Sequence, residues 1–168
     1  TSLETLPALL TVIVPVRWSS DRHDVEDRLS YVLHDTQRPD TVKVLVVDDN
    51  AANREILQQQ LQSWRMQVTC VDSGEQALTA ISRALAVGAP FQLAILDMHM
   101  PVMDGLQLAR AIKAQPECEG LRSMVLTSTC AQPDQQELRE AGILRYINKP
   151  IRRSDLRRVV AKMLTAGS

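Results

Sequence analysis

The chain has 168 residues, 45% of them hydrophobic, and a formal net charge of −1 at pH 7. This length suits one domain with its own core plus an extension, and the near-neutral charge excludes a general electrostatic affinity for nucleic acid or membranes. The three cysteines have no paired spacing, so we expect a reducing, cytoplasmic setting rather than a disulfide framework. The apolar stretch at 6–16 is too short to span a bilayer, so we predict neither a transmembrane helix nor a signal peptide.

Residues 1–40 are predicted to form an N-terminal extension to a main domain at 41–168. Within the extension, Leu10–Val16 has the apolar composition of a strand. Apolar residues at helical spacing then predict an amphipathic helix from Asp24 to about His34. Two roles stay open for this β-α unit: it mediates self-association, or it is left over from a larger protein.

The main domain alternates short apolar runs with segments of helical periodicity, which predicts a parallel sheet covered on both faces. The predicted strands lie at 44–47, 68–71, 91–96, 123–126 and 143–147. Five helices are predicted between and after these strands. Asn50 caps the first, which buries Leu57, Leu61 and Trp64, and Ser73 caps the second, which carries Leu78, Ile81 and Leu85. The other three lie at 105–114, at 134–141 with Pro133 at its first position, and at 154–165.

Polar residues follow four of the predicted strands: Asp48 and Asp49 after the first, Asp97 after the third, Thr127 after the fourth and Lys149 after the fifth. Because ligands bind beyond the carboxyl ends of parallel strands, we expect these side chains to share a site. Three carboxylates without histidine or cysteine partners suit Mg²⁺. With a hydroxyl and an ammonium nearby, the set could stabilise a phosphoryl group in transfer, and Asp97, which stands alone on its strand, is the better candidate nucleophile.

Four segments of the main domain occur in the order and spacing of a known family. They are Val-Val-Asp-Asp-Asn at 46–50, Leu-Asp-Met-His-Met-Pro-Val-Met-Asp-Gly at 96–105, Leu-Thr-Ser at 126–128 and Lys-Pro at 149–150. From residue 42 to about 165 the chain resembles the receiver domain of two-component response regulators. The resemblance implies a flavodoxin-like α/β fold, a three-layer sandwich whose five-stranded parallel sheet, in the order 2-1-3-4-5, carries helices on both faces.

The resemblance also implies the role of each site residue. Asp97 would accept a phosphoryl group from a phosphohistidine on a histidine kinase or a histidine phosphotransfer domain. Asp49 would be the principal Mg²⁺ ligand, assisted by Asp48, by Asp97 and by the main-chain carbonyl of His99. Lys149 would pair with the phosphoryl oxygens.

Two further residues would carry the switch. Thr127 would swing inward to hydrogen-bond the phosphoryl group, and Tyr146 would follow it from an outward to an inward rotamer. The surface at 134–165 would then rearrange. A half-buried strand aromatic with no switching role is the alternative interpretation of Tyr146.

Two alternatives come from other classes of protein. Residues 10–49 are similar to the opening of a family 2 glycosyltransferase, in which Val-Ile-Val-Pro-Val would begin a nucleotide-binding strand, but Asn50-Ala51 replaces the expected Gly-Ser. The receiver fold could instead serve as an interaction module that does not depend on phosphorylation. The segment at 34–39 partly matches the phosphoacceptor box of histidine kinases, and we interpret it as a helix end closed by proline.

Asn-Ala-Ala-Asn-Arg at 50–54 and Asp-Met-His-Met-Pro at 97–101 are typical of receivers attached to hybrid histidine kinases. A receiver by itself is not a conventional turnover enzyme, and the chain is either a stand-alone receiver or a piece of a hybrid sensor kinase. We expect no nucleic-acid partner and no membrane contact by this piece. A homodimer through the extension or through the 134–165 face is a further expectation.

Overall fold

The computed structural model describes residues 42–128 and 132–165, which form a five-stranded parallel sheet with the strand order β2-β1-β3-β4-β5. The strands are β1 (Lys43–Val47), β2 (Gln67–Val71), β3 (Leu93–Asp97), β4 (Arg122–Thr127) and β5 (Ile143–Asn148). Every neighbouring pair is parallel. The predicted fold class and strand order are therefore confirmed.

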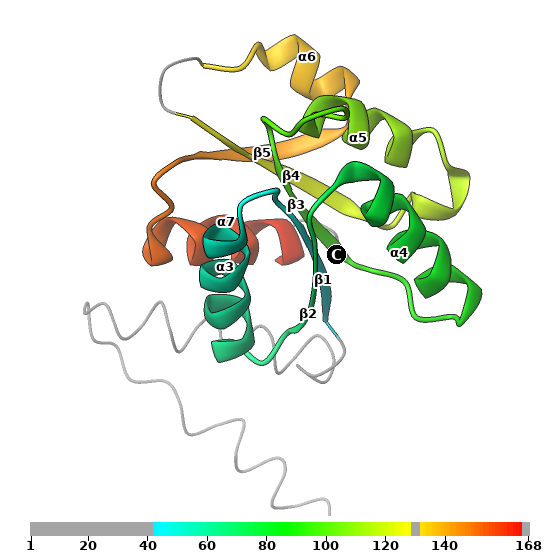
Figure 1. The fold of residues 1–168 in the computed structure, drawn as a ribbon, viewed down its shortest axis with the longest axis horizontal. Coiled ribbons are helices and arrows are strands. Elements are labelled where there is room, and N and C mark those ends of the chain that lie inside the picture. The colour runs from blue at the N-terminus through cyan, green and yellow to red at the C-terminus, as the bar shows by residue number, and fades with distance from the viewer. Residues whose placement is uncertain (1–41, 129–131, 166–168) are drawn as a thin grey trace, which may run out of the picture.

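Helices cover both faces of this sheet, as Figure 1 shows: α3 and α7 lie on one side, and α4, α5 and α6 on the other. The α-helices are α3 (Ala51–Ser63), α4 (Gly74–Ala86), α5 (Gly105–Lys113), α6 (Gln135–Glu140) and α7 (Arg153–Thr165). A short 3₁₀ turn, η3 (Pro116–Cys118), lies where only a loop was predicted. Among the described residues, no helix is both long enough and apolar enough to span a bilayer.

Alternate strand residues divide the interior into two cores, since successive side chains of a strand point to opposite faces. Leu45 and Val47 of β1 pack under α4, α5 and α6, whereas Val44 and Val46 pack under α3 and α7. All four are fully buried. This burial on both faces explains why the central strands are continuous apolar runs rather than alternating ones.

Two predicted caps are confirmed and one predicted helix start is wrong. Asn50 and Ser73 accept hydrogen bonds from the first free N–H groups of α3 and α4. Pro133, however, does not begin α6. The helix starts at Gln135, because the Asp134 side chain accepts the N–H of Gln136 and so acts as the N-cap one residue later.

The buried face of α4 also differs from the prediction in detail. Its fully packed residues are Ala77, Ile81 and Ala84, while Leu78 and Leu85 are only partly buried at the sides of this stripe. Small alanines let the helix approach the sheet closely, which leaves the longer leucines to cover the margins. The extension predicted at 1–40 lies outside the described residues and stays a prediction.

Candidate functional site

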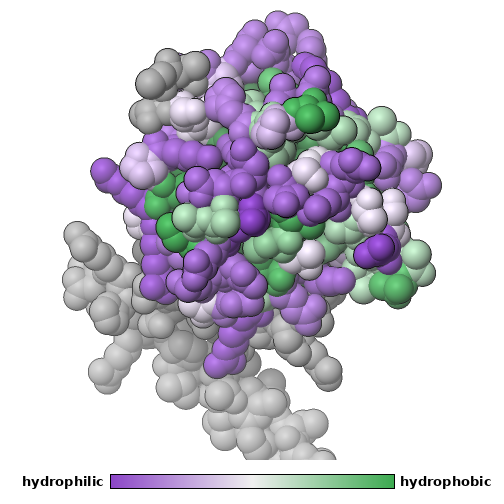
Figure 2. Space-filling view, in the orientation of Figure 1, coloured by the Kyte–Doolittle hydropathy of each residue, from purple (hydrophilic) through white to green (hydrophobic). Residues whose placement is uncertain are grey.

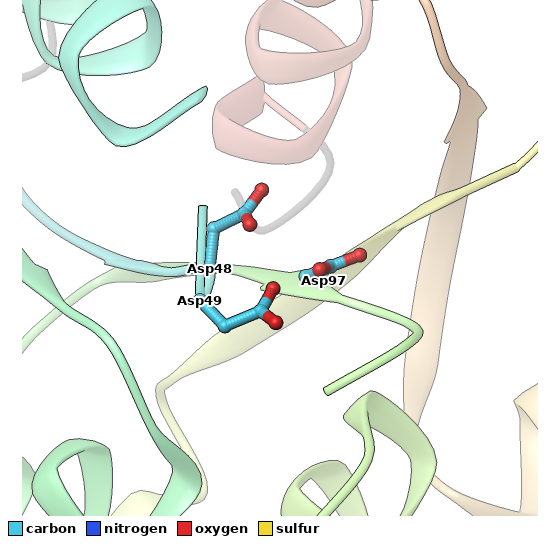
Figure 3. Close-up of side chains that lie close together, drawn as sticks. All are labelled: Asp48, Asp49 and Asp97. Carbon is cyan, nitrogen blue, oxygen red and sulfur yellow. The ribbon is translucent and has the colours of Figure 1, made fainter. Parts of the chain in front are cut away.

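Three carboxylates converge at the carboxyl ends of β1 and β3. The two strands are hydrogen-bonded neighbours with Val47 opposite Leu96, so Asp48 and Asp97 follow side by side. One carboxylate oxygen from each of Asp48, Asp49 and Asp97 lies within 4.8 Å of the others. Figure 3 shows the two side chains at the end of β1 directed toward the side on which Asp97 lies.

Asp48 is held rigidly from several directions. It is fully buried, its Oδ1 accepts the N–H of Asn50 at 2.9 Å, and its main-chain oxygen accepts the Arg54 guanidinium at 2.7 Å. Its Oδ2 is buried without a hydrogen bond and lies 3.5 Å from Lys149 Nζ. A buried acceptor of this kind requires a donor or a cation nearby.

Asp97 is also buried, with 2% of its surface exposed. Its Oδ1 accepts the Lys149 ammonium at 3.0 Å and the main-chain N–H of His99 at 3.3 Å. Burial raises the pKa of the Asp97 carboxyl above its ordinary value, and the charge of Asp48 acts in the same direction, whereas the hydrogen bond from Lys149 opposes both. With Lys149 beside two of the three clustered carboxylates, negative charge exceeds positive charge in this group when all its carboxylates are ionised.

Asp49 completes the group from the solvent side. Unlike Asp48 and Asp97 it is exposed, so it forms the outer rim of the acidic cluster. The donor set is made only of oxygens and combines two fixed buried carboxylates with one accessible carboxylate. These features fit a hard cation such as Mg²⁺, which takes oxygen ligands and keeps several waters.

The loop from β3 to α5 is fastened against Asp97. Met98 donates its N–H to Leu126 O at 2.8 Å, and Gly105 donates its N–H to Met98 O at 3.0 Å. A Cβ on Gly105 would lie 2.5 Å from the main-chain oxygen of Asp97. Asp104 then caps α5 in a reciprocal capping box. Both ends of the loop are thereby fixed relative to the central carboxylate.

Lys149 brings the fifth strand to the site. Its main-chain N–H donates to Thr127 O at 2.7 Å, and its ammonium contacts both buried carboxylates. Thr127 is itself buried, and its hydroxyl contacts the adjacent Ser128 O at 3.4 Å. Tyr146 is half-buried against the core under α4, α5 and α6. The switching roles of Thr127 and Tyr146 stay predictions, as does the ligand role of the exposed His99.

The structure thus brings Asp48, Asp49, Asp97 and Lys149 together, as predicted, and adds two residues that the sequence analysis did not assign to the site. Arg54 holds the main chain at Asp48 from the first turn of α3, and Gly105 allows α5 to approach β3. Both lie in recognised motif segments, but only the folded structure shows what each one contacts.

Comparison with known proteins gives a consistent result. The family model of the response regulator receiver domain matches residues 44–161. The chain is 37% identical over 123 residues to the sensor histidine kinase GacS of Pseudomonas protegens, covering 71% of this chain and 13% of that protein. It is 36% identical, again over 71% of this chain, to the hybrid signal transduction histidine kinase L of Dictyostelium discoideum, of which it covers 7%. The chain therefore spans only a small part of these relatives.

Solved structures with a similar fold include two receivers. The receiver domain of the Pseudomonas aeruginosa sensor histidine kinase PA1611, solved with a magnesium ion coordinated in its active-site cleft, matches with a TM-score of 0.63 and 28% identity, covering 73% of this chain and 97% of that one. The Vibrio cholerae chemotaxis protein CheY4 matches with a TM-score of 0.64 and 27% identity, covering 73% and 98% of the two chains.

Proposed function

Since the chain belongs to the response regulator receiver family of two-component systems, we propose that Asp97 is its phosphoacceptor. The observation that carries this proposal is the position of Lys149, whose ammonium lies 3.0 Å from Asp97 and 3.5 Å from Asp48. The single positive charge of Lys149 is shared between two negatively charged buried carboxylates, so a bound metal cation would neutralise the remaining negative charge. A structural ion pair would need no accessible third carboxylate, whereas Asp49 supplies one.

In the proposed step, a carboxylate oxygen of Asp97 attacks the phosphorus of a phosphohistidine on a histidine kinase or a histidine phosphotransfer domain. The new P–O bond forms as the P–N bond breaks, and the imidazole leaves with the electron pair and takes up a proton. Lys149 pairs with a phosphoryl oxygen, and the Thr127 hydroxyl donates to another. Asp97 needs no base to activate it, because it reacts as the carboxylate.

Asp48, Asp49 and Asp97 would hold Mg²⁺ together with the main-chain carbonyl of His99. The ion would neutralise charge on the phosphoryl oxygens. Asp48 is positioned for this by the N–H of Asn50, which occupies Oδ1 and leaves the buried Oδ2 available. Asp49 is the ligand with free access from solvent.

Thr127 would act as the switch together with Tyr146, and the surface at 134–165 would change its partner-binding properties. A short α6 of six residues, which buries Leu138 and is otherwise largely polar, supports this idea, because a weakly anchored helix is easier to shift. A homodimer through this face or through residues 1–40 is part of the proposal, as is a reducing, cytoplasmic setting. The glycosyltransferase alternative depends on residues 10–16, outside the described residues, while the receiver family accounts for Asp48 and Asp49.

The test is labelling with acetyl phosphate, followed by intact mass. We expect the gain of one phosphoryl group in the presence of MgCl₂, and no gain after chelation or in Asp97→Asn. Asp72→Asn is the matched control, because Asp72 is an exposed aspartate just after the neighbouring strand β2. Labelling that survives in Asp97→Asn, or that disappears equally in Asp72→Asn, would refute the assignment and would favour an interaction module.

A further inference from the structure

A cavity of about 500 Å³ lies at the amino ends of β4 and β5, bounded by α5, η3 and the end of α6. Cavities of this size hold small organic ligands in many proteins. The cavity is separate from the acidic cluster: Ser123 of β4 lines it, whereas Asp97 pairs with Leu126, about 10 Å further along the same strand. Much of its lining is apolar and comes from Ala109, Ile112, Leu121, Ala141 and Leu144.

Small residues leave this space between the helices and the sheet. Ala109 of α5, Ala141 at the C-cap of α6 and Ser123 of β4 are all buried, and each lines the cavity. A larger side chain at any of the three positions would reduce the cavity. Gly142, with a φ of +77°, then turns the chain from α6 into β5 without adding a Cβ.

Ser123 supplies a buried polar group to this lining. Its side chain is only 4% exposed, yet its hydroxyl makes no hydrogen bond to any part of the chain that the structure describes. The other three buried polar or charged residues of the described ranges, Asp48, Asp97 and Thr127, each contact a partner. Because a buried hydroxyl costs stability unless it is hydrogen-bonded, a ligand or a water in the cavity is expected to satisfy Ser123.

Lys113 lies close to Ser123 because β5 brings the two together. Ser123 is opposite Ile143 in the ladder between β4 and β5, and the stem of Lys113 packs on the preceding residue, Gly142, where a Cβ would lie 3.1 Å from Lys113 Cδ. The ammonium of Lys113 donates to Glu140 O at 3.0 Å, which uses one of its three donors and holds it beside the cavity.

Positive charge exceeds negative charge around the cavity. Lys113 and Arg122 line it with two positive charges, and Glu119 adds one negative charge. The guanidinium of Arg122 donates to Met163 O, so this cation is also held in place. The carbonyl end of α6 carries partial negative charge, which the bond from Lys113 to Glu140 O offsets. The lining therefore suits an anionic group on an apolar body.

Apolar exposure alone would not identify a ligand site on this molecule. The face drawn in Figure 2 is mostly hydrophilic with apolar patches between, and exposed apolar residues are common on protein surfaces. Ile56 and Val87 are exposed as well, but neither lines this cavity. The cavity differs from such patches because a buried hydroxyl and an anchored ammonium accompany its apolar lining.

We propose that this cavity binds a small organic carboxylate whose body is an apolar ring system. The carboxylate accepts hydrogen bonds from the Ser123 hydroxyl and the Lys113 ammonium, and the ring contacts Ile112, Leu121 and Leu144. Hydrogen bonds to an ionised acceptor are the stronger kind, and the apolar walls add the area that a ring buries. This site does not depend on the proposed function of Asp97.

The experiment titrates the full chain with 2-naphthoate and, separately, with 2-naphthamide, an uncharged analogue with the same ring. Binding is measured from chemical shifts in ¹H–¹⁵N NMR spectra. For 2-naphthoate we expect saturable shifts at Leu121, Gly142 and Leu144, with a dissociation constant of about 1 mM or lower. Binding of 2-naphthamide should be about tenfold weaker, because it lacks the charge.

Two variants and one matched control test the polar contacts. Ser123→Ala should weaken 2-naphthoate binding about tenfold without lowering the melting temperature, because the hydroxyl has no bond to lose in the described structure. Lys113→Met keeps a stem over Gly142 and should also weaken 2-naphthoate about tenfold, with little effect on 2-naphthamide. Lys162→Met removes an exposed lysine of α7, on the other face of the sheet, and should bind as the wild type does.

The absence of saturable shifts at a concentration about tenfold above the expected constant would mean that the cavity holds only water, and would overturn the proposal. Equal affinity for 2-naphthamide, unchanged affinity in Ser123→Ala, or an equal loss in Lys162→Met would overturn it too. So would shifts that cluster around Asp97 instead of the cavity. Because no phosphodonor takes part, each of these results leaves the role of Asp97 to its own test.

Discussion

Replacing Gly105 with alanine tests how tightly α5 is packed against the central carboxylate. The added Cβ would lie 2.5 Å from Asp97 O, 3.0 Å from Met98 Cα and 3.1 Å from Asp97 C. All three neighbours are main-chain atoms of β3 or of the residue directly after it, so no flexible side chain can move aside. Either α5 or the end of β3 has to shift.

The size of the effect follows from two opposing contributions. Overpacking a well-packed interior typically costs up to about 3 kcal/mol in unfolding free energy. We use this upper value because the added Cβ meets only main-chain atoms, which cannot move aside as a flexible side chain can. Alanine is favoured over glycine in a helix by at most about 1 kcal/mol, so the net loss in unfolding free energy is about 2 kcal/mol. For a chain of this length that corresponds to a fall of about 4–8 °C in melting temperature.

The assay is urea and thermal unfolding by circular dichroism, with Gly120→Ala as the control. A Cβ on Gly120 meets nothing within 4 Å, and this glycine has no positive φ, so we expect a change within about 0.5 kcal/mol. The added Cβ would press on the main chain of Asp97, the proposed phosphoacceptor, so Gly105→Ala should also slow labelling by acetyl phosphate. If Gly105→Ala is as stable as the wild type, α5 does not pack as closely against β3 at Gly105 as described.

Three further substitutions test the charges and caps around the site. Asn50→Ala removes the N-cap of α3 and should lower the unfolding free energy by about 1 kcal/mol in urea, whereas no change would mean that the cap is not formed in solution. Lys149→Ala leaves the ionised carboxylates of Asp48 and Asp97 without their shared cation, so we expect a loss of about 3 kcal/mol in unfolding free energy near neutral pH, the low end of the range for buried pairs because Lys149 is partly exposed. That loss should shrink as the pH falls and Asp97 is protonated; a pH-independent loss would contradict this reasoning. Asp97→Asn should raise the melting temperature of the metal-free protein at neutral pH, because burial raises the pKa of Asp97 and its ionised form therefore costs stability above that pKa. This gain should vanish at low pH, and a lower melting temperature at neutral pH would refute it.

Much of the fold could be predicted from local sequence. The apolar runs of the strands, the helical periodicity and the caps at Asn50 and Ser73 are signals read within a few residues, and the structure confirms them. The predicted start of α6 is wrong because Pro133 and Asp134 each favour a helix start, one residue apart. The hydrogen bond from the Gln136 N–H to the Asp134 side chain makes Asp134 the N-cap. Strand order followed from the family motifs, since an apolar run does not specify its neighbours.

The site divides in the same way. The sequence by itself determined that Asp48, Asp49 and Asp97 lie at one edge of the sheet, because parallel strands bring their carboxyl ends together. Tertiary structure alone decided that Asp48 is buried while its neighbour Asp49 is exposed, and that Lys149 reaches both buried carboxylates. It also decided that Val102 has a positive φ. The physical reason is that burial, charge sharing and backbone strain depend on which distant segments pack together, and no local pattern encodes those contacts.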